Sequence, residues 1–142
     1  MHEAGGRRFL LIGGILYLIF AILSILTAML FRANPDGIFN DFHIDFYGYV
    51  EIIDSYLIRA FSSSLVLGLS AVILRNNLKY ASTHLITVIG FTIISIAHFF
   101  RHPIPMDEIG FVSSIITTAI GSIPFFLCLL GAHRNMIEYE YE

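Results

Sequence analysis

Charged residues are scarce in this chain. Asp, Glu, Lys and Arg make up 13% of its 142 residues, and the formal net charge is −3. A soluble domain usually carries about 25% charged residues. The small acidic balance leaves no basic patch that could neutralise phosphates, so nucleic acid is not an expected partner.

Cysteine and recognisable catalytic motifs are lacking as well. Cys128 is the single cysteine, which excludes an intrachain disulfide and a cysteine-built zinc or redox site. The sequence contains no glycine-rich phosphate loop, no nucleophile elbow and no cysteine–histidine pair in a recognisable context. These absences argue against an enzyme.

Long apolar runs are abundant instead, at 56% hydrophobic residues. The first run, Phe9–Phe31, has no charged residue, and a helix of that length rises ~34 Å, enough to cross a hydrocarbon core of ~30 Å. Runs at about 51–74, 82–100 and 110–131 predict three further spans. We therefore expect one all-α domain over residues 1–142, a transmembrane up-down-up-down four-helix bundle whose immediate partners are membrane lipids.

The basic residues predict how the bundle lies in its membrane. Short linkers make neighbouring spans antiparallel and put both termini on one side. By the positive-inside rule, the side with more Lys and Arg near the span ends is cytoplasmic. That side holds Arg7, Arg8, Arg75, Lys79 and Arg134. The opposite side holds Arg32 and Arg101, with Arg59 just inside the second span at that end. We expect cytoplasmic termini, in the cytoplasmic membrane of a prokaryote.

Both ends of the chain carry a further expectation. The first apolar run exceeds the 7–15 residues usual in a signal peptide and has no convincing A-x-A cleavage site, so we expect it to be retained; cleavage would leave three helices. The final residues, EYEYE, predict a frayed and solvated end.

The long loop between the first two spans, residues 32–54, interleaves aromatic and acidic side chains. Aromatic rings accumulate at the membrane–water boundary. The loop is therefore expected to lie on the outer surface as an interfacial segment. The alternative is a cap over a pocket between the helices.

Polar side chains share one face of each of two spans. At 100° per residue, one face of the second span holds Glu51, Ser55, Arg59, Ser62 and Ser63, and one face of the third holds His84, Thr87, Phe91, Ser95, His98 and His102. Charged groups within a membrane normally face the bundle interior and mark a function or an internal pair.

These faces predict a site in the outer leaflet. Its members are Glu51, Asp54, Arg59, His98 and His102. Such a cluster could pair Arg59 with a carboxylate, bind a cation, relay a proton or hold a polar head group. The simpler interpretation is that the cluster only links the second helix to the third and has no other role.

No cofactor is the leading expectation, although two sites are conceivable. His84 and His133 could bridge one haem near the inner surface. His43, His98 and His102, with a carboxylate, offer zinc or iron ligands, although no HExxH spacing accompanies them.

Small residues predict close helix contacts. The fourth span carries a small-residue face from Gly110 to Gly121, and Pro124 is expected to kink it. Ser64 and Gly68 form a second small-xxx-small pair, on the second span. These faces could serve the bundle itself or a homo-oligomer.

The layout resembles a known family. Four short spans, a long first outer loop, the segment VEIIDSYLIRAF with Glu51 and Arg59, and Leu-Gly-Leu at 67–69 are similar to the DoxX-like small four-helix membrane proteins. The resemblance implies the fold. Some members of that set are associated with sulfur-compound or quinone-linked oxidoreduction.

Three functions follow as hypotheses. The first is a structural or accessory protein, self-associating or a subunit of a membrane complex. The second is a ligand-binding or redox-linked bundle that holds a lipid, quinone or similar amphipathic molecule in an outer-leaflet pocket. The third is a proton- or ion-coupled transporter acting as an oligomer. A cavity of roughly several hundred Å³ between the second and third spans would favour the second hypothesis.

Overall fold

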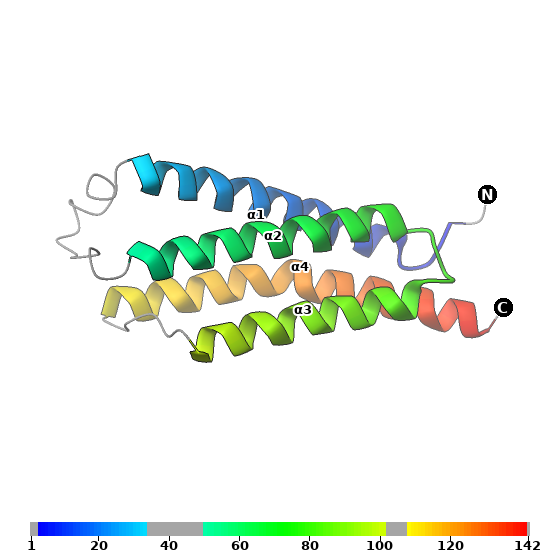
Figure 1. Cartoon of the computed structure of the whole chain (residues 1–142). Coiled ribbons are helices and arrows are strands. Elements are labelled where there is room, and N and C mark those ends of the chain that lie inside the picture. Colours follow the sequence, from blue (N-terminus) through cyan, green and yellow to red (C-terminus); the bar gives the residue numbers. More distant parts are fainter. Residues whose placement is uncertain (1–2, 34–49, 102–107, 142) are drawn as a thin grey trace.

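Four long helices lie side by side in the computed structural model, which describes residues 3–33, 50–101 and 108–141 (Figure 1). They are α1 (Arg7–Ala33), α2 (Val50–Leu74), α3 (Ala81–Arg101) and α4 (Glu108–Glu140). Each contains a stretch long and apolar enough to cross a membrane. The predicted all-α class with four candidate spans is therefore confirmed.

Neighbouring helices run antiparallel, so the bundle has two distinct ends (Figure 1). At the terminal end α1 begins and α4 ends; at the loop end α2 begins and α3 ends. The membrane side on which each end lies stays a prediction. The predicted interfacial segment falls mainly on residues 34–49, outside the described residues.

The four helices are packed unevenly. α1 packs most extensively against α2 and next against α4, whereas α3 packs against α4 and only lightly against α2. The interface between α2 and α3 is therefore the loosest of the four, and it contains the predicted polar faces.

Glycines explain why α1 lies so close to its neighbours. A Cβ built on Gly14 would lie 3.0 Å from the carbonyl oxygen of Gly68, and one on Gly68 would lie 2.9 Å from that of Gly14. On the other side of α1, a Cβ on Gly131 would lie 2.9 Å from the carbonyl oxygen of Gly6. Without side chains at these positions the backbones can approach closely.

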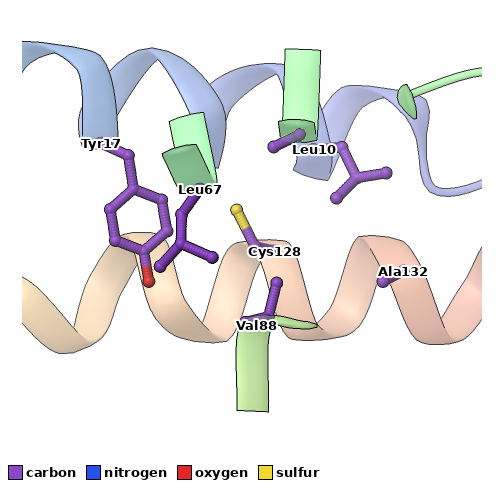
Figure 2. Close-up of a cluster of buried hydrophobic side chains, with 7 residues drawn as sticks. Leu10, Tyr17, Leu67, Val88, Cys128 and Ala132 are labelled. Atoms are coloured by element: carbon purple, nitrogen blue, oxygen red, sulfur yellow. The ribbon is translucent and has the colours of Figure 1, made fainter. Parts of the chain in front are cut away.

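The core is narrow, as this close approach requires. Large apolar side chains such as Ile73 and Ile86 point outward, where lipid would cover them. Figure 2 shows the buried cluster between the helices. It consists of Leu10, Tyr17, Leu67, Ala71, Val88, Cys128 and Ala132.

The end of α4 differs from the sequence-based expectation. The helix runs on past Gly131 to Glu140 and so includes the first residues of the EYEYE tail, of which Tyr139, Glu140 and Tyr141 are exposed, as expected of a solvated end. Asn135, in the extension, has none of its surface exposed, and the Glu138 carboxylate accepts a hydrogen bond from the Gly5 amide at 2.7 Å. These contacts with the segment before α1 give the added turns a partner.

Candidate functional site

A cavity of about 400 Å³ lies between α2 and α3, in the half of the bundle toward the loop end. Its position follows from the loose packing of these two helices. α4 closes the back of the space with small residues, among them Gly121 and Ser122. A Cβ built on Gly121 would meet nothing within 4 Å, so this wall leaves the space unfilled.

Polar side chains line the part of the cavity nearest the loop end. Arg59 and Ser63, one turn apart on α2, contribute one wall, and Ser95 and His98 on α3 contribute the facing wall. The two polar faces predicted from helical periodicity therefore meet across this cavity.

Apolar side chains line the deeper part. Leu67, Phe91 and Phe125 come from three different helices, and Tyr17 of α1 completes this floor. Leu67 and Tyr17 are buried members of the core cluster (Figure 2). The cavity thus changes from polar to apolar along the direction of the helices.

An aromatic contact joins the two polar walls. The rings of Tyr56 and His98 meet edge to face, with centroids 4.9 Å apart and planes at 60°. The Tyr56 hydroxyl also lies 3.5 Å from the carbonyl oxygen of Phe99. This pair connects α2 to α3, the two helices with the loosest interface, and His98 is only 8% exposed.

The predicted site residues are placed as follows. Arg59 and His98 both line the cavity. Glu51 and Asp54 lie on the first turns of α2, but their side chains are outside what the structure describes, and so is His102. Pairing of Arg59 with a carboxylate therefore stays a prediction, as does the role of the cluster.

Arg59 is the charged member of this wall. Its side chain is exposed, and it makes no ion pair or hydrogen bond with another residue in the described part of the chain. The apolar stretch of α2 begins at Ser55, so Arg59 lies about 6 Å inside it, at 1.5 Å per residue. A guanidinium at that depth must reach surface water or a negative group.

The hydroxyl groups differ between the two walls. On α3, Thr92 and Ser95 each donate to a carbonyl oxygen of their own helix at 2.9 Å. On α2, Ser63 and Ser64 make no hydrogen bond within the described residues. The hydroxyls that remain for a ligand are therefore these two, beside Arg59, and that of Thr118 on α4, which also makes no hydrogen bond within the described residues.

The two histidines named for haem, His84 and His133, differ in their surroundings. His84 is buried, 2% exposed, and its Nε2 lies 3.4 Å from Ser70 Oγ, whereas His133 is exposed. No three His, Cys, Asp or Glu side chains converge on a metal site in residues 3–33, 50–101 and 108–141. His43 and His102 lie outside these ranges, so both sites stay predictions.

Sequence reasoning missed a polar cluster at the terminal end, which we call the terminal clasp: Ala4, Gly5, Gly6, Asn76, Asn135 and Glu138. Its centre is the Asn135 side chain, whose Oδ1 accepts from the Gly6 amide at 2.8 Å and whose Nδ2 donates to the carbonyl oxygen of Arg75 at 3.1 Å. One amide group thereby joins the starts and ends of three helices.

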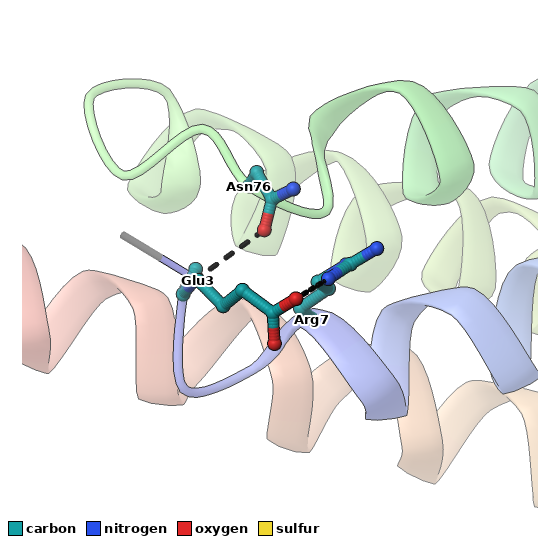
Figure 3. A network of polar contacts seen from close by, with 4 residues as sticks. Glu3, Arg7 and Asn76 are labelled. Atoms are coloured by element: carbon teal, nitrogen blue, oxygen red, sulfur yellow. Dashed lines mark hydrogen bonds and ion pairs between the residues drawn. The ribbon is translucent and has the colours of Figure 1, made fainter. Parts of the chain in front are cut away.

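The segment before α1 is held at further points (Figure 3). The Ala4 amide lies 3.4 Å from Asn76 Oδ1, in the connection between α2 and α3. Glu3 forms an ion pair with Arg7 on the first turn of α1. The amide groups at the start of a helix have no hydrogen-bond acceptor within the helix. Here side chains from α4 and from the connection between α2 and α3 act as the acceptors. In the sequence, the available sign of this cluster was Asn135, a single asparagine just beyond the apolar run of the fourth span.

The chain matches no family model, no curated protein and no solved structure. The resemblance to the DoxX-like proteins stays a prediction. The cavity and its lining are therefore the basis on which a function can be argued for this multi-pass membrane protein.

Proposed function

We propose that this protein is a small membrane-embedded binding protein that holds one amphipathic molecule in the cavity between α2 and α3. The observation that supports the proposal is the cavity itself. Its volume of about 400 Å³ lies within the range of ligand pockets, about 300–1,000 Å³.

The lining supports an amphipathic ligand over a fully polar one. A polar part near the loop end and an apolar floor deeper in the bundle match a molecule with a head group and an apolar body. A lipid, a quinone or a similar molecule has that form. The structural and transport hypotheses stay predictions, because no feature of the described residues favours either of them.

Filling the cavity tests the proposal. Gly121→Leu would place a side chain in the cavity, because nothing lies within 4 Å of a Cβ at that position. Gly90→Leu is the matched control: its Cβ also meets nothing within 4 Å, and Gly90 does not line the cavity. The measurement is native mass spectrometry of gently extracted protein.

We expect the wild type and Gly90→Leu to retain an added mass, and Gly121→Leu to lose it. An absorption spectrum of the same samples would report a quinone or a haem. Equal retained masses in all three proteins would place the bound molecule elsewhere and contradict the proposal.

A further inference from the structure

Building on the proposed function, we infer that the cavity selects an anionic head group: its ligand is a single-chain amphiphilic acid whose head binds Arg59 and whose chain extends toward Leu67. Three observations support this assignment. They are the charge of the lining, the position of the unused donors and the dimensions of the space.

The charge of the lining is one-sided. Arg59 is the only charged residue among the side chains that line the cavity in the described part of the chain, and no Asp or Glu accompanies it there. It is also the only charged residue of the stretch Ser55–Leu74. A charge within a membrane is costly unless paired, so a negative head group would supply what this wall lacks.

The unused donors lie where such a head group would sit. Ser63 is one turn from Arg59 on α2, and Ser64 follows it. Both hydroxyls lack a hydrogen bond to any described residue, whereas those of Thr92 and Ser95 are already committed to α3. A carboxylate is an acceptor only, so Arg59, Ser63 and Ser64 of the α2 wall can all donate to it.

The dimensions favour a single chain. From Arg59 to Leu67 the helix rises about 12 Å. An extended chain advances about 1.2 Å per bond, since a peptide residue of three bonds spans at most about 3.3–3.6 Å, so about ten carbons cover that distance. The volume agrees, because about 400 Å³ lies near the lower end of the range of ligand pockets, about 300–1,000 Å³. We therefore expect one chain rather than two inside the cavity.

The test compares three probes with one chain length. Dodecanoic acid, dodecanol and dodecyltrimethylammonium are titrated into the full chain in nanodiscs of zwitterionic phospholipid, at a pH well above the pKa of a carboxylic acid. Empty nanodiscs give the partition background, which is the same for every variant. We expect dodecanoate to bind about tenfold or more tighter than dodecanol, and the cation to bind most weakly.

Substitution of Arg59 should remove this preference. In Arg59→Gln, dodecanoate and dodecanol should bind alike, and Arg59→Lys should keep part of the difference because the charge remains. Arg101→Gln is the control, since Arg101 is an exposed arginine on α3 near the same end and does not line the cavity. It should leave the preference unchanged.

The possible failures can be told apart. If dodecanol binds as tightly as dodecanoate and Gly121→Leu abolishes both, the anionic head group is wrong while the binding cavity stands. If none of the probes binds in a way that Gly121→Leu changes, the proposed function fails too. Displacement of dodecanoate by an anionic diacyl phospholipid in the nanodisc would overturn the single-chain assignment.

Discussion

At the scale of single residues, Asn135 is the polar side chain on which most depends. It is fully buried, and it satisfies the Gly6 amide and the Arg75 carbonyl group at once. A buried polar group left without a partner costs about 1–3 kcal/mol. If Asn135 is replaced and the site stays closed, no water molecule can take its place as the partner of the buried Gly6 amide.

Asn135→Leu should therefore lower the free energy of unfolding by about 2–4 kcal/mol, because it leaves the buried Gly6 amide and the partly buried Arg75 carbonyl group unsatisfied. Asn135→Asp should also destabilise the bundle, because it keeps the acceptor for Gly6 but loses the donor to Arg75 and buries a carboxylate. Reversible unfolding in mixed micelles measures both. His133→Leu, at an exposed position two residues away, is the control. Equal stability of Asn135→Leu and the control would contradict the role of the clasp.

The sequence predicted some residue positions and missed others for a physical reason. Arg59 and His98 stand out because they are polar within apolar helices, and helical periodicity indicates which way such residues face. Asn135 lies beyond the apolar run, where polar residues are ordinary. Its burial depends on the segment before α1, 129 residues away in the chain, which periodicity cannot reveal.

At the scale of elements, α1 is positioned by glycine contacts. Gly68→Ala should destabilise the bundle by about 1–3 kcal/mol, as overpacking of a tight core does. Its Cβ would come within 2.8 Å of Leu18 and 2.9 Å of the Gly14 carbonyl oxygen.

Gly90→Ala gives the matched comparison, measured by the same unfolding assay. Nothing lies within 4 Å of its Cβ, and Ala favours a helix over Gly by about 1 kcal/mol. It should be neutral or stabilising. A Gly68→Ala protein as stable as Gly90→Ala would show that the α1–α2 contact is not tight.

Helix boundaries were predictable where the membrane sets them. The third span, expected at 82–100, is α3 at Ala81–Arg101, because apolar length decides both its ends. The fourth was expected to end at Gly131, where the apolar run stops, but α4 continues to Glu140. Its last turns are stabilised by contacts with a segment that is distant in the chain. The hydrophobicity of the sequence does not indicate such contacts.

At the scale of the whole molecule, the cavity links ligand binding to stability. A ligand that binds only the folded bundle stabilises it, by about 2.7 kcal/mol at a concentration of 100 times Kd. Dodecanoate should therefore raise the Tm of the wild type and of Gly90→Leu. Gly121→Leu should show no such rise, because its side chain occupies the space. A rise of equal size in Gly121→Leu would place the ligand outside the cavity.

From the sequence, a cavity between the second and third spans could be predicted only as one of two alternatives. Polar faces on the second and third spans are compatible with direct contact between the helices as well as with a space between them. The outcome depends on how far apart α2 and α3 lie, which is set by the small residues of α4 and by the tight packing of α1 on the other side.

The terminal clasp also has a consequence for the order of assembly. At about 5–20 residues per second, a ribosome makes Gly6 and Asn135, 129 positions apart, roughly 6–26 s apart. During that interval α1 can already lie against α2, while the Gly6 amide has only water or lipid head groups as partners. The bond between Gly6 and Asn135 therefore forms late, and its formation marks the moment when the ring of four helices closes.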